Sequence, residues 1–238
     1  MTEWFEEWFG EEYLQLYPHR DETEADRIVE LIVRTVPVEA PAVVLDVACG
    51  AGRHARAFKQ RGYRPIGLDL SWHLLLRARE CARVPLVRSD IRAMPIRPGS
   101  VDLAVNLFTS FGYFASDEEH RDALGQMTGT VRRGGWFVLD FLNAARVARE
   151  LVAAEAVTLG SVRVQVDRWL EDDGRYVYKS ITAPDRRQFI ERVRLFDESD
   201  LTLMLEQSGC VIRHRFGSYQ GDPTGPDAPR VILMGERE

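Results

Sequence analysis

The chain has 238 residues, 45% of them hydrophobic and 29% charged, with a formal net charge of −6, so we expect one large domain or a domain with a sizeable insertion. Acidic residues outnumber basic ones, so the composition gives no sign of the basic surface that binds a nucleic-acid backbone, and we expect no nucleic-acid partner. No apolar run approaches the ~20 residues that a membrane span requires, so we expect no membrane partner.

The N-terminal segment is predicted to form two helices before the main fold begins. Aromatic side chains recur at close to helical spacing over Met1–Tyr17, glutamates fill much of the other face, and Pro18 ends the pattern. We expect this amphipathic helix either to pack against the domain edge or to form a lid over a ligand. A second apolar stripe predicts a helix over Thr23–Val36.

A strand, a glycine turn and a helix follow one another in the segment VVLDVACGAGRHARAFK. The apolar run Val43–Val47 predicts a buried strand, Gly50 and Gly52 form the turn, and a helix over Arg53–Arg61 ends at Gly62. The two glycines let a ligand approach the backbone, and the helix N-terminus offers unpaired N–H groups. This arrangement is half of a nucleotide-binding unit.

Two carboxylates narrow the choice of ligand. Arg64–Leu70 is predicted to be a second strand, and Asp69 near its end suits a ribose diol because a carboxylate can accept two hydroxyl hydrogen bonds. The glycine turn also satisfies the looser dinucleotide fingerprint, so NAD is one candidate. Asp46, in the first strand, argues against NAD because it would repel two nearby phosphates, whereas it suits a ligand with a cationic amino-acid end.

The following elements continue to alternate between helix and strand. We expect helices that begin after the caps Ser71 and Ser116, the second within the capping box Ser116-Asp-Glu-Glu119, and a third that begins at Asp197. The expected strands are Pro85–Ser89, Val101–Leu107, Trp136–Phe141, Val211–Phe216 and Arg230–Glu236, with a turn at Arg132–Gly135 before the third. Strands that alternate with helices predict a parallel, doubly wound sheet, and the last two strands fit an antiparallel hairpin at its edge.

Residues 157–196 depart from this alternation. Val157–Leu170, Arg175–Ile181 and Gln188–Phe196 alternate in a β-like way, and Asp172-Asp173-Gly174 is a strong hairpin turn. We expect three antiparallel strands inserted after the fifth strand of the sheet. They either cover a substrate or build a homodimer, and the sequence does not choose between these.

Five segments in order, LDVACGAG, GLDLS, SDIRAMP, VDLAVNLFTSFGYF and RRGGWFVLDFLN, resemble the motifs of the class I S-adenosylmethionine (SAM)-dependent methyltransferases. The resemblance covers Val43–Asn143 well and Phe196–Arg237 more loosely. NLFTSFGYF, and a Tyr-x-x-x-Tyr pair followed by Arg near the N-terminus, resemble the small-molecule branch that includes the sugar N-methyltransferases. The Asp/Asn-Pro-Pro-Tyr motif of amino-methylating nucleic-acid enzymes is absent.

This resemblance implies an α/β fold with a doubly wound, mostly parallel, seven-stranded Rossmann-like sheet and an inserted antiparallel sheet. It implies SAM as cofactor and S-adenosylhomocysteine (SAH) as product. The expected division is N-terminal helices or lid at 1–40, a SAM-binding core at 41–156, the insertion at 157–196, and the C-terminal part of the core sheet at 197–238.

The resemblance also implies the residues of the site. Asp90 and Ile91 stand where the adenine is bound, although Asp90 could instead cap the turn before Met94. The N-terminal tyrosines and arginine reach the methionine carboxylate and the substrate. The expected cofactor-binding residues are Tyr17, Arg20, Asp46, Ala48, Gly50, Gly52, Asp69, Leu70, Asp90, Ile91, Asn106 and Leu107. The expected substrate-binding residues are Tyr13, Phe111 and Tyr113, the last two of which could equally be core.

The chemistry of a sulfonium methyl group requires little from the protein beyond orientation. We expect the enzyme to align a nucleophile in line with the C–S bond and to exclude water, with transfer to N or O of a small-molecule acceptor. A base helps only where the nucleophile must lose a proton, and Tyr17 and Tyr113 are weak candidates. The alternatives are an NAD-dependent oxidoreductase, a SAM-binding protein without methyl transfer, and a protein or RNA methyltransferase.

Cysteine usage and the N-terminus indicate the compartment. Cys49, Cys81 and Cys210 are odd in number and lack CxxC spacing, which favours reduced thiols. The acidic, aromatic N-terminus does not resemble a secretory signal. We therefore expect a cytoplasmic protein, and no metal site is expected because no ligand constellation is visible.

Overall fold

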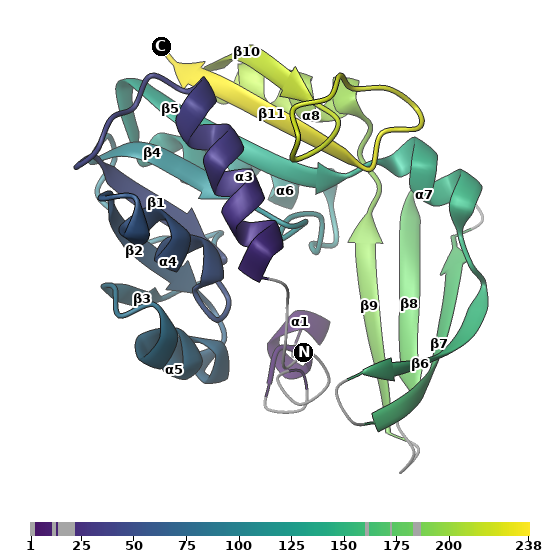
Figure 1. The fold of residues 1–238 in the computed structure, drawn as a ribbon. Helices are drawn as coiled ribbons and strands as arrows, with labels where there is room; N and C mark the ends of the chain where they lie inside the picture. The colour runs from purple at the N-terminus through teal and green to yellow at the C-terminus, as the bar shows by residue number, and fades with distance from the viewer. Residues whose placement is uncertain (1–2, 11–12, 14–21, 160–161, 172, 183–186) are drawn as a thin grey trace.

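The structure, a computed structural model, describes residues 3–10, 13, 22–159, 162–171, 173–182 and 187–238. Two sheets stand side by side: a large sheet flanked by helices, and a smaller sheet formed by β6 to β9 (Figure 1). The large sheet has seven strands, as expected. In spatial order they are β10 (Cys210–Phe216), β11 (Arg230–Arg237), β5 (Val131–Leu142), β4 (Val101–Asn106), β1 (Val43–Val47), β2 (Arg64–Asp69) and β3 (Leu86–Arg88).

The large sheet is mostly parallel. Parallel pairing joins β3, β2, β1, β4 and β5, and only β11 runs antiparallel to its neighbours β5 and β10. The core strands are apolar because both of their faces are covered. One face packs against α6 (Asp117–Gly129) and α8 (Glu198–Gln207), and the other against α3 (Glu22–Thr35) and α4 (Arg53–Gln60).

The expected helix caps are confirmed. Ser71 Oγ accepts a hydrogen bond of 3.1 Å from the Leu74 N–H at the start of α5 (Trp72–Cys81). Ser116 and Glu119 form the reciprocal capping box of α6, and Asp197 accepts from the Asp200 N–H at the start of α8. These caps fix the residue at which each helix begins, because they satisfy backbone N–H groups that have no partner within the helix.

The expectation of one helix across Met1–Tyr17 is wrong. The first helix, α1, covers only Trp4–Trp8, and the chain leaves helical geometry at Phe9 and bends at Gly10. Glycine is a poor helix former, and the aromatic spacing continues across it without a continuous helix. Tyr13 is again helical.

The insertion has four strands where three were expected. They are β6 (Ala154–Leu159), β7 (Val162–Leu170), β8 (Tyr176–Thr182) and β9 (Gln188–Arg194), paired antiparallel in that order. The segment Val157–Leu170, expected as one strand, contributes to two strands, because Leu159 pairs with Val162. Gly174, at the predicted Asp-Asp-Gly turn, takes a φ of +69° between β7 and β8.

Two further differences lie at the ends of β5. The strand begins at Val131, and the pairing with β4 jumps from Val101↔Val131 to Leu103↔Trp136, so the expected turn at residues 132–135 is a bulge within the strand. A Cβ on Gly135 would lie 2.7 Å from the Asp102 carbonyl oxygen, so the bulge requires glycine there. After β5, the short helix α7 (Ala144–Glu150), which was not expected, leads into the insertion.

Candidate active site

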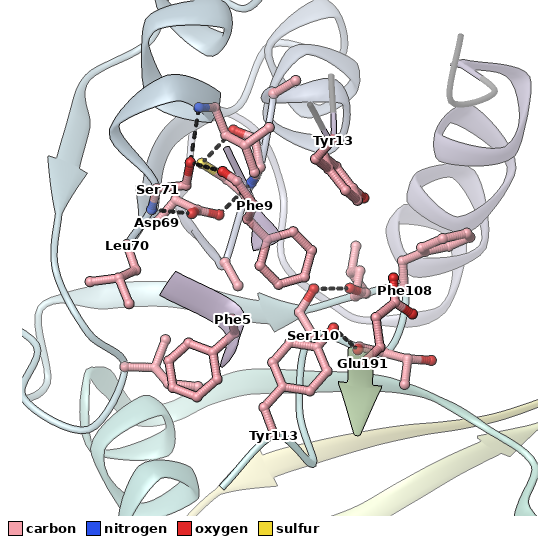
Figure 2. Close-up of a pocket in the computed structure, with 18 of the residues that line it drawn as sticks. Phe5, Phe9, Tyr13, Asp69, Leu70, Ser71, Phe108, Ser110, Tyr113 and Glu191 are labelled. Carbon is pink, nitrogen blue, oxygen red and sulfur yellow. Dashed lines mark hydrogen bonds between the residues drawn. The ribbon is translucent and has the colours of Figure 1, made fainter. Parts of the chain in front are cut away.

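A cavity of about 1230 Å³ lies at the carboxyl ends of the central strands, bounded also by α1 and the insertion sheet. The residues that follow β1, β2, β3 and β4 all contribute to its wall. Open α/β sheets bind ligands at this edge because the loops after adjacent parallel strands converge there. Figure 2 shows the two sides of the pocket, with Asp69 and Ser71 on one and Ser110, Tyr113 and Glu191 on the other.

The glycine turn after β1 adopts left-handed backbone at Ala48, Gly50 and Gly52, with φ of 57°, 55° and 80°. A Cβ on Gly50 would meet nothing closer than Leu74 Cδ1 at 4.0 Å, so space lies open beside it. A Cβ on Gly52 would lie 2.9 Å from Ala82 Cβ, so this glycine serves the packing of α4 against the end of α5. The two glycines therefore have different roles.

Asp69, at the end of β2, hydrogen-bonds to the glycine turn. It is 8% exposed and lines the cavity, with Oδ2 accepting from the Gly50 N–H at 2.7 Å and Oδ1 from the Ser71 N–H at 2.8 Å. Burial raises the pKa of Asp69, and these backbone donors oppose the rise. A carboxylate has about four acceptor sites. Not all of them are taken by the backbone donors, so Asp69 retains capacity for a ligand hydroxyl group.

Asp46 lies beneath the turn and is not part of the cavity wall. It is 1% exposed and accepts from the Ala55 N–H at 3.1 Å, in the first turn of α4. Burial raises the pKa of Asp46 to about 7, and the negative charge of Asp69 adds to the rise. Its position indicates that it braces the turn, whereas direct contact with a ligand was expected.

Asp90 and Ile91 both line the cavity, after β3. Arg92 binds the Asp90 carboxylate with Nη2 at 2.7 Å, and its backbone N–H donates to Oδ1 at 2.8 Å. Although burial acts to raise it, the hydrogen bonds and charge of Arg92 hold the pKa of Asp90 below its ordinary value. Asp90 therefore caps this turn as an anion, as the alternative interpretation had it, and also faces the cavity.

Asn106, at the end of β4, is fully buried and does not line the cavity, whereas Leu107 does. Its Nδ2 donates to the Val47 carbonyl oxygen at 3.2 Å and to that of Ser110 at 3.4 Å. Its Oδ1 is buried and accepts no hydrogen bond from any residue that the structure describes. Asn106 thus ties the loop after β4 to the end of β1.

The loop after β4 carries backbone strain that sequence reasoning missed. Phe108 and Thr109 both have φ of 61°, which is uncommon for residues other than glycine. Asp140 on β5, fully buried, holds them: its Oδ2 accepts from the Phe108 N–H at 2.8 Å, and its carbonyl oxygen accepts from the Thr109 N–H at 3.0 Å. Strain of this kind persists where the surroundings fix it, and it concentrates at functional sites.

Two further residues complete this cluster around Asp140. Arg230 Nε donates to Oδ1 at 2.7 Å, and the Tyr219 hydroxyl donates to Oδ2 at 2.7 Å. Burial and the charge of Asp140 raise the pKa of Tyr219, which keeps it a donor. Arg230 Nη2 also donates to Thr109 Oγ1 at 2.9 Å, and Arg230 lines the cavity. The sequence did contain a sign of this cluster. Asp140 lies inside the apolar run FVLDF, and a carboxylate buried with such a strand requires hydrogen-bonding or charged partners.

Aromatic side chains enclose the side of the cavity near α1. Tyr13 and Tyr113 line it, as expected of substrate-binding residues. The Tyr113 hydroxyl donates to the Thr109 carbonyl oxygen at 2.8 Å, and Trp4 packs edge-on against the Tyr113 ring at 5.0 Å between centroids. The Ser71 hydroxyl donates to the Phe9 carbonyl oxygen, which joins this segment to the loop after β2.

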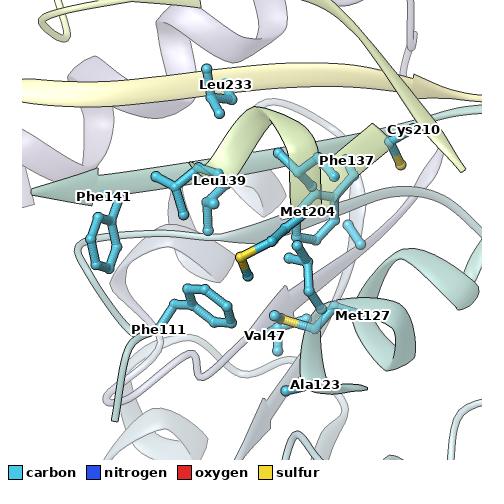
Figure 3. Packing of buried hydrophobic residues seen from close by; sticks show 14 of the residues in the cluster. Val47, Phe111, Ala123, Met127, Phe137, Leu139, Phe141, Met204, Cys210 and Leu233 are labelled. Atoms are coloured by element: carbon cyan, nitrogen blue, oxygen red, sulfur yellow. The ribbon is translucent and has the colours of Figure 1, made fainter. Parts of the chain in front are cut away.

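Phe111 does not line the cavity. It is fully buried, and its ring stacks on that of Phe196 at 5.7 Å between centroids. Figure 3 shows Phe111 beside Phe141, which lies edge-on to it. Of the two alternatives for Phe111, the structure places the side chain in the hydrophobic core between the large sheet, α6 and α8, and not against a substrate. Tyr17 and Arg20, expected to contact the cofactor, lie outside the described residues.

The insertion sheet supplies cavity residues that sequence reasoning also missed. They are Arg168, Val177, Lys179, Glu191 and Val193. Within the described ranges, no group of three or more His, Cys, Asp or Glu side chains is placed to hold a metal ion. No helix in the described part of the chain combines the length and apolar character needed to cross a membrane.

These residues fit SAM. Asp69 retains acceptor capacity for ribose hydroxyls, the turn at Gly50 leaves open space beside the backbone, and the side chains of Leu70, Ile91 and Leu107 provide an apolar wall. The N-terminus of α4 adds N–H groups that suit a carboxylate. This set favours an adenosyl group carrying an amino acid over a dinucleotide.

Comparisons with known proteins agree with this fit. The profile of the family described as "Methyltransferase domain" matches residues 44–135. The chain is 32% identical to a dTDP-3-amino-3,4,6-trideoxy-alpha-D-glucopyranose N,N-dimethyltransferase of Streptomyces venezuelae, covering 85% of this chain and 86% of the relative. It is 26% identical to a glycine/sarcosine N-methyltransferase of Parasynechococcus marenigrum, over 92% of this chain and 78% of the relative.

Solved structures share the fold. The CcbJ methyltransferase of Streptomyces caelestis aligns with a TM-score of 0.81 and 16% identity, covering 96% of this chain and 97% of that one. SAM-bound CalS10, an amino pentose methyltransferase of Micromonospora echinaspora, aligns with a TM-score of 0.68 and 21% identity, covering 93% of each chain. The 32% identical relative, a methyltransferase over 86% of its length, sets the NAD-dependent oxidoreductase aside. The chain belongs to the class I S-adenosylmethionine-dependent methyltransferases.

Proposed function

We propose that this enzyme transfers the methyl group of SAM to a nitrogen or oxygen of a small-molecule acceptor, with an amine as the favoured acceptor. The observation that carries the proposal is the cavity, which is bordered by α1 and the insertion sheet and is lined by aromatic side chains and by charged side chains of both signs. A concave cavity of about 1230 Å³ that is covered in part has room for a small molecule beside the cofactor.

The relatives support the preference for nitrogen. The 32% identical relative is named as acting on the amino group of a dTDP-sugar, and another as a glycine/sarcosine N-methyltransferase. A malonyl-[acyl-carrier protein] O-methyltransferase of Pseudescherichia vulneris, 26% identical over 82% of this chain and 74% of the relative, keeps oxygen as the alternative.

We assign the cofactor side of the cavity to the loops after β1, β2, β3 and β4. Asp69 would bind the ribose hydroxyl groups, and Asp90 and Ile91 would bind the adenine. Gly50 and Leu107 would border the other parts of the cofactor. Arg20 and Tyr17 remain proposed ligands of the methionine end. The bound cofactor supplies an electrophilic methyl group, so the protein's task is to hold the acceptor in line with it.

The described residues support orientation as the main source of rate acceleration. Well-aligned reactants can lower a barrier by roughly 7–11 kcal/mol. Tyr113 was a weak candidate for a general base. Its hydroxyl group donates a hydrogen bond to the Thr109 carbonyl oxygen, so we assign Tyr113 to positioning the acceptor and not to removing its proton. The aromatic segment around α1 and the insertion sheet would exclude water from the reacting groups.

We retain the division into a lid at 1–40, a core at 41–156, an insertion at 157–196 and a C-terminal part at 197–238 as a proposal. The insertion could also mediate a homodimer, because Trp169 and Ile190 on it are 41% and 44% exposed. Sedimentation velocity at micromolar concentration tests this, and a monomer at all concentrations would rule it out.

Two experiments test the function. In the first, thermal unfolding is followed with SAM, SAH, NAD or no ligand. A ligand at 100 times its dissociation constant adds about 2.7 kcal/mol, which is a shift of several degrees at about 2–4 °C per kcal/mol. Stabilisation by SAM and SAH alone is expected, and stabilisation by NAD alone would contradict the cofactor assignment.

The second experiment measures SAH release with panels of small amines, amino sugars, sugar nucleotides, hydroxy acids, total RNA and protein extracts. We expect turnover with a small amine. Turnover with RNA or protein alone would favour the alternative of a protein or RNA methyltransferase. One relative, 26% identical, is named as a probable 18S rRNA (guanine-N(7))-methyltransferase, which is why RNA is included in the panel. SAH binding without turnover on any panel would favour a SAM-binding protein without methyl transfer.

A further inference from the structure

Five aliphatic side chains line the cavity away from the loops that we assign to the cofactor. Leu142 ends β5, Val147 lies on α7 and Leu151 directly after it, and Val177 and Val193 lie on β8 and β9. All five are partly exposed. Apolar side chains that are exposed singly need no explanation, whereas a set that lines one concave site is typical of a surface that a ligand covers.

The helix α7 presents apolar side chains to the cavity and buries none of its residues. The structure describes the whole helix, and no residue in it is buried. Val147 and Leu151 are four positions apart, so they lie on the same side. A short helix is normally stabilised by packing an apolar face against the protein. Among the described residues, neither side chain belongs to a hydrophobic cluster or packs against one, so only the cavity lies beside them.

Polar contacts hold α7 in place instead. Asn143 caps the helix, and its Nδ2 donates to the carbonyl oxygens of Gly225 and Ala228, both at 2.8 Å. Arg149 Nη2 lies 2.9 Å from Asp227 Oδ1. These contacts anchor α7 to the loop between β10 and β11. The orientation of the helix therefore does not depend on burial of its apolar side chains.

The insertion sheet adds the other two side chains beside α7. Val177 and Val193 are directly opposite each other in the register of β8 and β9. After α7 the chain joins β7, where the Arg168 N–H donates to the Ala153 carbonyl oxygen at 2.7 Å, and β7 is the neighbour of β8 (Figure 1). The helix and the sheet thus form adjoining parts of one wall.

The charged side chains on this wall already have partners within the chain. Arg168, Lys179 and Arg230 line the cavity, and each lies beside a carboxylate, at 2.6, 3.3 and 2.7 Å respectively. A ligand therefore does not have to supply a counter-charge here. The part of this wall that lacks a partner of its own kind is hydrocarbon.

We propose that Leu142, Val147, Leu151, Val177 and Val193 form a subsite for an aliphatic group of the acceptor. The inference rests on the proposed function and adds a feature of the substrate to it. In the large sheet, β5 lies on the far side of β4 from β1 and β2, so a group beside Leu142 belongs to the acceptor and not to the cofactor. Each methylene group that is buried there should tighten binding about fourfold.

The probes are the 1-alkanols from 1-propanol to 1-hexanol, which carry no charge and differ only in chain length. Their dissociation constants are measured by ligand-observed NMR titration of the full chain, with and without saturating SAH. We expect the dissociation constant to fall about fourfold for each added methylene group until the subsite is filled. In parallel, n-propylamine to n-hexylamine are tested as methyl acceptors.

Two variants locate the binding. Val147→Thr and Val177→Thr each replace a methyl group of the wall by a hydroxyl group. We expect each to weaken 1-hexanol binding about threefold or more and to flatten the dependence on chain length. The matched control is Val211→Thr, at a partly exposed position on β10 that is not part of the cavity wall, and it should leave 1-hexanol binding unchanged. The thermal transition and the SAH affinity of all three variants should match those of the unaltered protein.

The outcomes separate this proposal from the proposed function. Binding that does not depend on chain length, or an equal loss in the Val211 variant, would overturn the subsite. A homodimer that the alkanols dissociate would overturn it as well, because a second copy would then be what covers these side chains. Chain-length-dependent alkanol binding without methylation of any amine would contradict the preference for an amine acceptor and leave the subsite supported.

Discussion

Replacing Asp140 by Asn should destabilise the protein and loosen the cavity wall. The carboxylate accepts hydrogen bonds from the Phe108 N–H, the Tyr219 hydroxyl and Arg230 Nε at 2.8, 2.7 and 2.7 Å. An amide offers only one acceptor oxygen, and it turns a donor toward groups that are themselves donors. It also leaves the guanidinium of Arg230 without its counter-charge.

The size of the effect follows from burial. Asp140 is fully buried and the Arg230 side chain is 18% exposed. Removing one partner of a buried ion pair costs about 3–5 kcal/mol. The partly exposed guanidinium favours the lower end, about 3 kcal/mol, which is a shift of about 6–12 °C in Tm at 2–4 °C per kcal/mol. The carbonyl oxygen of residue 140 still accepts from Thr109, so the loop should shift rather than unfold.

The assay is urea unfolding followed by tryptophan fluorescence, together with SAH affinity. The matched control is Asp102→Asn, because Asp102 pairs with Arg132, whose side chain is 50% exposed, and its contribution should be about 0–1 kcal/mol. A loss below 1 kcal/mol for Asp140→Asn, or an equal loss for the two variants, would refute the reasoning that this carboxylate balances a buried cation and fixes the strained loop.

Three further predictions concern the cofactor side. Asp69→Ala should weaken SAM binding by about 1–3 kcal/mol in calorimetry, and an unchanged affinity would place the ribose elsewhere. The pKa of Asp46 is raised to about 7 in the folded state, whereas that of an unperturbed Asp is about 4. Between about pH 4 and pH 7 the folded state therefore holds a proton on Asp46 that the unfolded state has released. Its contribution to the unfolding free energy should fall as pH rises from 4 to 7, and Asp46→Asn should flatten that slope; a steeper slope in the variant would contradict the assignment. Gly52→Ala should cost more unfolding free energy than Gly50→Ala in urea titrations, because both adopt positive φ but only Gly52 would press a Cβ against Ala82; equal costs would contradict the packing argument.

Local signals in the sequence predicted much of the fold. Ser71, Ser116 and Asp197 begin helices as expected, since capping depends on residues within one turn. The strand, glycine turn and helix at Val43–Gly62 were likewise readable, because each element is specified by its own neighbours. The missed hairpin between β6 and β7 had a local signal too, the Gly160-Ser161 pair between two apolar runs.

What the sequence could not predict depends on contacts between distant segments. The strain at Phe108 and Thr109 is imposed by Asp140, 32 positions from Phe108. The opposed pair of Arg168 and Lys179 arises only from the register of two strands, and a shift of one residue would turn one of them to the other face. Periodicity showed that these segments were strands without showing which charges would meet.

The place of β11 in the large sheet has a consequence for biosynthesis. Of the seven strands of this sheet it is the last to be made, yet it lies between β5 and β10 and carries Arg230, the counter-ion of Asp140. Ribosomal synthesis adds about 5–20 residues per second, and N-terminal parts fold first. Until β11 has been made, Asp140 lacks its counter-ion, and Thr109 lacks the hydrogen bond that Arg230 donates to its hydroxyl oxygen. The part of the cavity wall that Arg230 and the loop after β4 form is therefore completed only after the other strands of the large sheet, the glycine turn and the loop at Asp69 have been made.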